Sequence, residues 1–147
     1  MIGLLQRVSQ ASVSVDGTTI GSINTGLLAL IGIEANDEKS HAEKLLNRIL
    51  NYRVFPDDEG RMNRSLSTIQ GGLLLVPQFT LVADTNSGTR PSFSSGASPE
   101  QGRILFDYLV EIARKSYEIV QTGQFGADMQ VSLINDGPVT FWLETKK

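Results

Sequence analysis

Residues 26–33 are Gly-Leu-Leu-Ala-Leu-Ile-Gly-Ile, a run without a single polar side chain. A continuous apolar run of this length, in which polar and apolar residues do not alternate, is suited to a strand that is buried on both faces. We therefore predict a buried strand over Leu27–Ile33.

The residues before this run predict further strands, beginning at residue 2. Val13 and Val15 alternate with serines, and Asp16-Gly17 supplies the residue types that a two-residue hairpin turn requires. The chain would then return over residues 18–20. Residues 2–33 are therefore expected to be mostly strand.

Two long helices are predicted further along the chain. The first spans about Asp37–Arg53, with Asp37 able to cap its start. Its apolar residues keep helical spacing at Ala42, Leu45, Leu46, Ile49 and Leu50. The second helix is marked by Ser98 as N-cap, by Pro99 at the first helical position and by Gln101, which can close a capping box.

The other segments are predicted as loops and strands. Residues 55–70 are expected to form an irregular loop, because Pro-Asp-Asp-Glu-Gly at 56–60 is typical of turns. A strand over 73–81 is interrupted by Pro77, which cannot donate to a ladder. Residues 83–97 form a long loop, and loops of this length are usually functional or disordered. Two strands, over 129–134 and 139–143, would flank a last turn.

These elements together predict an α+β fold with a mainly antiparallel, partly barrel-like sheet and two long helices. The length of 147 residues is the usual size of one domain, so residues 1–147 are expected to form a single domain.

Composition restricts the possible functions. The net charge of −3 and the sequence pI of about 5.1 count against a broad basic face for nucleic acid. The absence of cysteine excludes disulfides, thiolate metal sites and a cysteine nucleophile, and fits a cytoplasmic protein. The apolar runs are too short to span a bilayer, and the N-terminus does not have the pattern of a signal peptide.

The sequence contains few of the residues and motifs on which conventional catalytic sites are built. The one histidine, His41, falls near the start of a helix and is predicted to be a surface residue. Without cysteine, only an all-carboxylate metal site would remain, and the spacing of the acidic residues does not suggest one. Glycine-rich nucleotide-binding motifs are also missing. An enzyme with this sequence would have to work with backbone groups, amides, hydroxyls and atoms of its substrate.

Two segments fit that description. In residues 76–81, Gln78 and Thr80 interrupt an apolar strand and could share one face. A kink at Pro77 could free the N–H groups of Phe79 and Thr80 as oxyanion donors. The alternative, which spacing alone favours, is a half-exposed edge strand. The second segment, 135–140, contains Gly137-Pro138 and by itself indicates only a hairpin turn.

Both segments resemble the two signature motifs of the D-aminoacyl-tRNA deacylases. Val-Pro-Gln-Phe-Thr-Leu at 76–81 corresponds to one motif and Asn-Asp-Gly-Pro-Val-Thr at 135–140 to the other. The likeness extends along the whole chain, through residues 6–8, 90–93, 96–99, 122–129 and 139–143.

The resemblance implies a homodimeric enzyme without metal or cofactor. Such an enzyme cleaves the ester between the 3′-terminal adenosine of tRNA and a D-amino acid, or glycine mischarged on tRNA-Ala. It implies that the backbone of Gln78, Phe79 and Thr80 presents N–H donors to the ester carbonyl.

The same resemblance assigns the substrate-binding residues. Gly137-Pro138 would be a cis peptide inserted into the pocket of the partner subunit, where its carbonyl groups exclude an L side chain. Arg7 would hold this loop, and Phe125 and Met129 would line the pocket.

Pro77 stands where the usual family motif has serine, and it resembles a related animal deacylase that removes misattached L-alanine. A broader deacylase that also removes L-alanine is therefore one alternative. A non-catalytic dimer that binds RNA ends is another, since no conventional triad is present. A small-molecule esterase is a weaker third.

Overall fold

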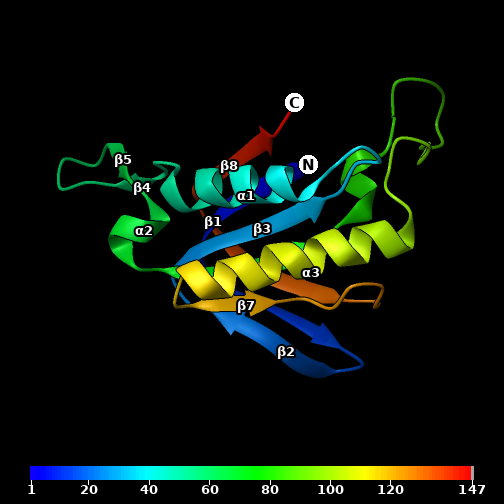
Figure 1. Cartoon of the computed structure of the whole chain (residues 1–147). Helices are drawn as coiled ribbons and strands as arrows, with labels where there is room; N and C mark the ends of the chain where they lie inside the picture. Colours follow the sequence, from blue (N-terminus) through cyan, green and yellow to red (C-terminus); the bar gives the residue numbers. More distant parts are fainter. Residues whose placement is uncertain (147) are drawn as a thin grey trace.

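Strand β3 (Gly26–Gly32) runs through the middle of the sheet in the computed structural model, which describes residues 1–146 (Figure 1). Leu27 and Ile31 pack into the larger hydrophobic cluster, which also contains the apolar faces of the two long helices. Leu28 packs into a second cluster, formed between strands. Both faces of β3 are therefore buried, which confirms the prediction for this segment.

The sheet around β3 has six strands. They are β1 (Ile2–Val15), β2 (Thr18–Ile23), β3, β6 (Gly72–Pro77), β7 (Val120–Thr122) and β8 (Gln130–Glu144). Strand β1 pairs antiparallel with β2, β3 and β8, whereas the β3–β6 and β6–β7 pairings are parallel.

The two ends of the strand path, β2 and β7, approach each other closely. A β-carbon on Gly21 of β2 would lie 2.9 Å from the carbonyl oxygen of Thr122 on β7, so the absence of a side chain permits this approach. The sheet is thus mainly antiparallel and nearly closed into a barrel. The predicted single-domain α+β fold is confirmed.

Helices α1 (Lys39–Asn51) and α3 (Pro99–Ser116) are the two long helices that the sequence predicts. Their buried residues, such as Leu45 and Leu109, join the larger core cluster and cover one face of the sheet (Figure 1). Among residues 1–146, none of the helices has the length and apolar character needed to cross a membrane.

The cap of α3 follows the prediction in part. The Ser98 hydroxyl accepts a hydrogen bond from the Gln101 N–H at 3.2 Å, and Pro99 occupies the first helical position. The Gln101 side chain, however, does not close a capping box. Its amide donates to the carbonyl oxygens of Ala35 (3.0 Å) and Asp37 (3.3 Å), which ties the start of α3 to the turn before α1.

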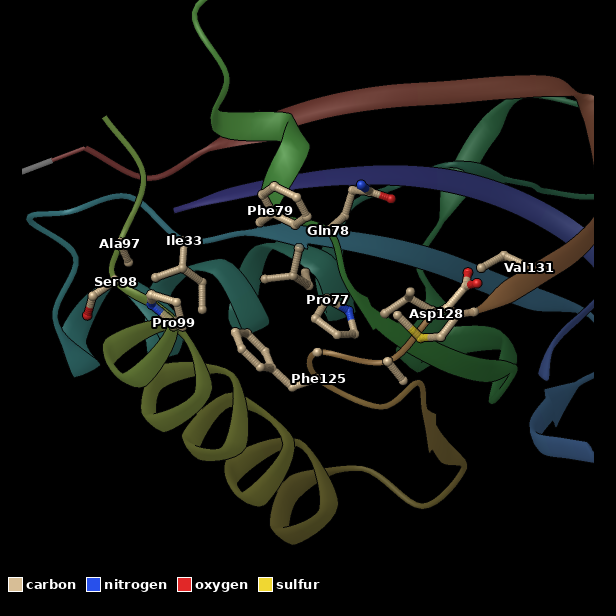
Figure 2. A pocket seen from close by; sticks show the side chains of 16 residues that line it. Ile33, Pro77, Gln78, Phe79, Ala97, Ser98, Pro99, Phe125, Asp128 and Val131 are labelled. Atoms are coloured by element: carbon tan, nitrogen blue, oxygen red, sulfur yellow. The ribbon is translucent and has the colours of Figure 1, made fainter. Parts of the chain in front are cut away.

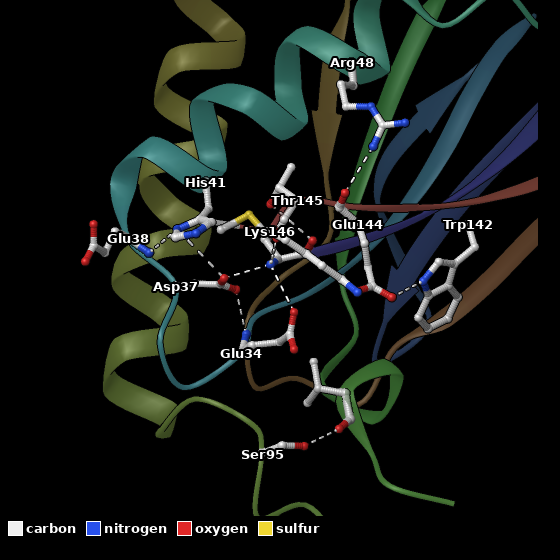
Figure 3. Close-up of polar contacts among 12 residues, drawn as sticks. Glu34, Asp37, Glu38, His41, Arg48, Ser95, Trp142, Glu144, Thr145 and Lys146 are labelled. Carbon is white, nitrogen blue, oxygen red and sulfur yellow. Dashed lines mark hydrogen bonds and ion pairs between the residues drawn. The ribbon is translucent and has the colours of Figure 1, made fainter.

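The start of α1 differs from the prediction. Glu38, not Asp37, is the N-cap, and its backbone N–H donates to His41 Nδ1 at 2.9 Å. The Asp37 carboxylate instead accepts hydrogen bonds from the Met1 ammonium and from the Glu34 N–H, both at 2.7 Å (Figure 3). The prediction that His41 is a surface residue was wrong. His41 is only 4% exposed, because its side chain accepts the hydrogen bond from the Glu38 N–H at the start of the helix.

Residues 55–70 are more regular than the predicted loop. They contain β4 (Phe55–Pro56), β5 (Met62–Arg64) and α2 (Leu66–Ile69). The Asp57 carboxylate organises the β4–β5 hairpin, since it accepts hydrogen bonds from the Asn63 amide and from two backbone N–H groups of the turn. These hydrogen bonds, that from Asn63 above all, lower the pKa of Asp57.

The predicted turn between two C-terminal strands is also corrected. Strand β8 is continuous and pairs with β1 on both sides of the Gly137-Pro138 bond, which is cis. Asn135 and Thr140 are the nearest paired residues, so residues 136–139 leave the ladder as a bulge. We call these four residues the Gly-Pro bulge. The chain does not reverse there, because both halves of β8 have the same partner strand.

Side chains on both strands hold the Gly-Pro bulge. Arg7 donates from Nε to the carbonyl oxygen of Asp136 (3.1 Å) and from Nη1 to that of Val54 (2.8 Å). The Asn135 amide donates to the carbonyl oxygens of Arg7 (3.0 Å) and Val139 (2.9 Å). The bulge is therefore fixed by hydrogen bonds within one chain.

Replacement of Asn135 with alanine is expected to lower the free energy of unfolding by about 1–2 kcal/mol, because two partly buried carbonyl groups lose their donor. Urea denaturation measures this loss, and amide hydrogen exchange over residues 136–139 should become faster. Asn86→Ala, at an exposed side chain of the 83–97 loop, is the control. Stability and exchange equal to those of the control would contradict the bracing role of Asn135.

Candidate active site

A pocket of about 500 Å³ opens where β3 and β6 end, a volume within the range of small-molecule sites (Figure 2). The start of α3 and the segment 125–131 complete its wall. It is lined by Ile31, Ile33, Val76, Pro77, Gln78, Phe79, Ala97, Ser98, Pro99, Gly102, Phe125, Gly126, Ala127, Asp128, Met129 and Val131.

The segment predicted as a strand over 73–81 changes direction at this pocket. Strand β6 ends at Pro77, and Phe79–Val82 form the 3-10 helix η1. The Gln78 N–H still donates to the Ile31 carbonyl oxygen at 2.7 Å, which is the last hydrogen bond between β3 and this segment. The expected alternation of Gln78 and Thr80 on one strand face was therefore wrong.

This change leaves two backbone donors without an acceptor. Hydrogen bonds are made by the N–H groups of Gln78 and Leu81, the latter to the Gln78 carbonyl oxygen at 3.3 Å. The N–H groups of Phe79 and Thr80 lie at the start of η1 and have no acceptor within residues 1–146. The first N–H groups of a helical turn always lack a partner in their own helix, and they can bind an oxyanion.

The predicted catalytic residues are only partly in the pocket wall. Gln78 and Phe79 line it, whereas Thr80 is exposed beside it. The Gln78 amide donates a hydrogen bond to the Thr80 hydroxyl. His41 does not line the pocket, and among residues 1–146 no group of acidic and histidine side chains is arranged to hold a metal ion.

The long loop over 83–97 is anchored next to the pocket. Asp84 and Ser92 exchange two backbone hydrogen bonds (2.7 and 3.0 Å), and the Ala97 N–H donates to the carbonyl oxygen of Ile33. Phe93 of this loop contacts Phe79, with ring centroids 5.3 Å apart. Phe79 lines the pocket and is 65% exposed, so Phe93 packs against an exposed residue of the pocket wall.

Phe125 and Met129 both line the pocket. The Phe125 ring packs against the buried Phe106 ring at 6.4 Å, and the guanidinium of Arg103 lies 5.2 Å from its centroid. Gly102 provides room for this ring, since a β-carbon there would lie 3.1 Å from Phe125.

Gly137, Pro138 and Arg7 do not line the pocket of their own chain. Both residues of the cis peptide are exposed, while Arg7 is held beneath them. The two motifs that the sequence singled out are thus not brought together within one copy. Asn135 and Asp128 were not assigned individual roles from the sequence, and their positions in the second motif and beside Met129 are the signals that could have identified them.

Comparisons with known proteins agree on one family. The model of the D-Tyr-tRNA(Tyr) deacylase family matches residues 4–144. A D-aminoacyl-tRNA deacylase of Alkalilimnicola ehrlichii is 61% identical over 146 residues, 99% of this chain and 97% of the relative. A protein of the same name from Pseudomonas aeruginosa is 61% identical over 145 residues, 99% of this chain and 100% of the relative.

Two solved structures extend the comparison. The structure titled c-Myc DNA Unwinding Element Binding Protein has a TM-score of 0.95 and 38% identity, with 100% of both chains covered. A probable eukaryotic D-amino acid tRNA deacylase has a TM-score of 0.83 at 16% identity, with 98% of both chains covered, and shows the same fold. Together with the family match over nearly the whole length, these findings show that the chain belongs to the D-Tyr-tRNA(Tyr) deacylase family and is a hydrolase of the D-aminoacyl-tRNA deacylase class.

Proposed function

We propose that this protein hydrolyses the ester that joins a D-amino acid to the 3′-terminal adenosine of tRNA, as a chiral proofreading enzyme of the cytoplasm. The observation that carries the proposal is the pair of unpaired N–H groups of Phe79 and Thr80 at a pocket of ligand size. The deacylase names of its relatives agree with this chemistry.

The proposed reaction needs no protein nucleophile. Water attacks the ester carbonyl carbon, and the developing oxyanion accepts hydrogen bonds from the Phe79 and Thr80 N–H groups. The bond to the ribose oxygen then breaks, and that oxygen receives the proton, which releases the free amino acid and the tRNA 3′ end. One oxyanion donor contributes on the order of 10²–10³ in rate. An aminoacyl ester is already activated, so this contribution suffices without a catalytic histidine, and a ribose hydroxyl can assist.

The second motif would act in the partner subunit of a homodimer. Residues 136–138 of the Gly-Pro bulge are exposed, and the bulge is braced and does not reach the pocket of its own chain. Ile134 and Trp142, on either side of the bulge along β8, are 52% and 49% exposed and offer apolar surface for a second copy. We infer that the bulge of each subunit enters the partner's pocket, next to Met129.

In this arrangement, chirality is selected by exclusion. The carbonyl oxygens of Gly137 and Pro138 would point at the α-carbon of the substrate and leave no space for an L side chain. Glycine has no side chain to exclude, so glycine mischarged on tRNA-Ala would also be hydrolysed. Because Pro77 lines the pocket where related sequences have serine, release of L-alanine is the second candidate activity.

The test of chirality compares aminoacyl-tRNAs that differ only in the handedness of the amino acid. We expect rapid release of D-tyrosine and little release of L-tyrosine from charged tRNA. Equal rates would refute chiral selection while leaving the hydrolase assignment intact.

Other outcomes would identify the alternative functions. Release of L-alanine at the rate of D-alanine would identify the broader deacylase, and binding of tRNA without any release would identify a non-catalytic RNA-end binding protein. Preferential cleavage of a simple D-amino-acid ester would favour the esterase.

A proline substitution can remove one proposed oxyanion donor, the Phe79 N–H, and leave the charge of the protein unchanged. Phe79→Pro deletes the N–H at the first position of η1, where proline is tolerated, and the backbone of Gln78 (φ −142°, ψ 85°) lies outside the helical region that a following proline disfavours. We expect kcat to fall about 10²–10³-fold relative to Phe79→Ala, which loses the same ring but keeps the N–H. Equal kcat values for the two variants would refute the role of this donor.

If the bulge of each subunit acts in the partner's pocket, two variants that are damaged in different motifs should complement each other in a mixed dimer. Gly137→Val damages the bulge and Phe79→Pro damages the pocket, so each homodimer should be inactive. After the two are unfolded and refolded together in equal amounts, about a quarter of the native activity per subunit should return, since only heterodimers contain one intact site. If both motifs acted within one chain, the mixture would stay inactive.

A further inference from the structure

Three basic side chains lie along the second half of α1 and just after it. Lys44 and Arg48 are four residues apart, so they share one row of the helix, and Arg53 follows the end of the helix. All three are exposed, and none makes an ion pair within residues 1–146. We call these three residues the basic strip. The strip offers uncompensated positive charge on a chain whose net charge is −3.

One side chain joins the basic strip to the Gly-Pro bulge. Arg7 donates to the carbonyl oxygens of Val54 (2.8 Å) and Asp136 (3.1 Å), so the residue after Arg53 and the first residue of the bulge share one donor. The Asp136 carboxylate lies 3.6 Å from Arg7 Nε and is therefore already compensated by a cation. Arg53 and the bulge are thus neighbours on one surface.

From the bulge, the strip follows β8 to its end. The Tyr52 ring contacts the Phe141 ring, with centroids 5.7 Å apart. The Arg48 guanidinium lies over the Tyr52 ring, 5.7 Å from its centroid, and its Nη1 donates to the Glu144 carbonyl oxygen at 3.1 Å (Figure 3). The Glu144 carboxylate has its own cation, Lys146 Nζ, at 3.5 Å. The positive charge of Arg48 is therefore held in place without being neutralised.

This arrangement is suited to the phosphates of single-stranded RNA. The aromatic ring and the hydrogen bond fix the orientation of the Arg48 guanidinium and leave its other N–H groups free. A planar guanidinium with free N–H groups can bind a phosphate through two parallel hydrogen bonds. Cations beside partly exposed aromatic rings, here Tyr52 and Phe141, are the combination that binds unpaired nucleotides in many proteins.

We infer that the basic strip of each subunit binds the phosphates of the nucleotides that precede the terminal adenosine, while that adenosine occupies the partner's pocket. An RNA strand that leaves this pocket passes the bulge that enters it, and the strip is the surface next to that bulge. The inference rests on the proposed function, because it requires both an aminoacyl-tRNA substrate and exchange of the bulge between subunits.

A strip of this size agrees with the acidic composition of the chain. On a single strand, each neutralised phosphate contributes about 0.7 to the slope of log K against log salt concentration. Three contacts would therefore give a slope of about 2, which is a modest electrostatic contribution, and the pocket would supply the remaining affinity. Such a division requires no broad basic face, so it is compatible with a net charge of −3.

Two esters that differ only in the upstream nucleotides test the strip. D-tyrosyl-tRNA carries these nucleotides, and D-tyrosyl-adenosine does not. For the double variant Arg48→Gln with Arg53→Gln, we expect kcat/KM to fall about tenfold with the first ester, mainly through KM, and to change less than about twofold with the second. Lysine at both positions should retain most of the activity, because the charge remains. Arg114→Gln with Lys115→Gln removes the same charge near the end of α3 and is the matched control.

Binding of uncharged tRNA provides a measurement that does not depend on catalysis. The slope of log K against log salt concentration should become shallower by about 1.4 in the Arg48→Gln, Arg53→Gln variant, since two phosphate contacts are lost, and should stay native in the control. A native slope in this variant, or equal effects on the two esters, would overturn the strip. If the native protein releases D-tyrosine from neither ester, the proposed function itself fails.

The mixed dimer of Gly137→Val and Phe79→Pro chains shows which subunit supplies the strip. Its one intact site combines the pocket of the Gly137→Val chain with the bulge of the Phe79→Pro chain. Loss of the strip from the Phe79→Pro chain should therefore lower release of D-tyrosine from tRNA about tenfold, whereas its loss from the other chain should change release less than about twofold.

The reverse result, or equal effects from the two chains, would overturn the placement of the strip beside the partner's pocket. A mixed dimer that is inactive before the strip is changed would refute exchange of the bulge and, with it, this placement.

Discussion

Burial of β3 on both faces is the constraint on which the other elements depend. Because Leu27 and Ile31 face one way and Leu28 the other, the strand needs an apolar layer on each side. Helices α1 and α3 supply one layer, and the curved sheet supplies the other. The parallel pairing of β3 with β6 then brings the carboxyl ends of two strands to the same edge, which is where pockets form in parallel sheets.

The end of β6 follows from the same arrangement. The Gln78 N–H points toward β3, so the nitrogen of Pro77, which cannot donate, points to the opposite edge. There β7 has already ended at Thr122, paired with Leu75. Pro77 therefore removes no hydrogen bond from the ladder, and the chain is free to turn into η1. Two unpaired N–H groups at a pocket are the chemical result of this geometry.

Features that depend on neighbouring residues were predictable from the sequence. The two-sided burial of residues 27–33 and the Ser98 cap of α3 are examples, since the residues that cause them are adjacent in the chain. The form of residues 78–82 was not predictable, because it depends on where β7 ends, some forty residues later. The Gly-Pro bulge was mistaken for a turn for a similar reason. Its backbone is held by Arg7, and by pairing with β1 at the other end of the chain.

The same contrast between features set by neighbouring residues and features set by distant ones applies to the residues assigned to the site. The sequence motifs identify Gln78, Phe79, Gly137 and Pro138 as candidate site residues. They do not show how far apart these residues lie in the fold. Asp128 and Arg103 are ordinary charged residues in the sequence. Only the fold shows that Asp128 lines the pocket and that Arg103 is stacked on Phe125, another residue of the pocket wall.

Gly102 links the width of the pocket to the position of a neighbouring positive charge. The Phe125 ring occupies the space that a side chain at position 102 would take, and Arg103, the next residue, lies over that ring. A larger residue at 102 would displace the ring and, with it, the surface on which the guanidinium rests. The width of the pocket and the placement of the Arg103 charge beside it therefore change together. Relatives with a larger residue at this one position should differ in both the width of the pocket and the position of the charge beside it.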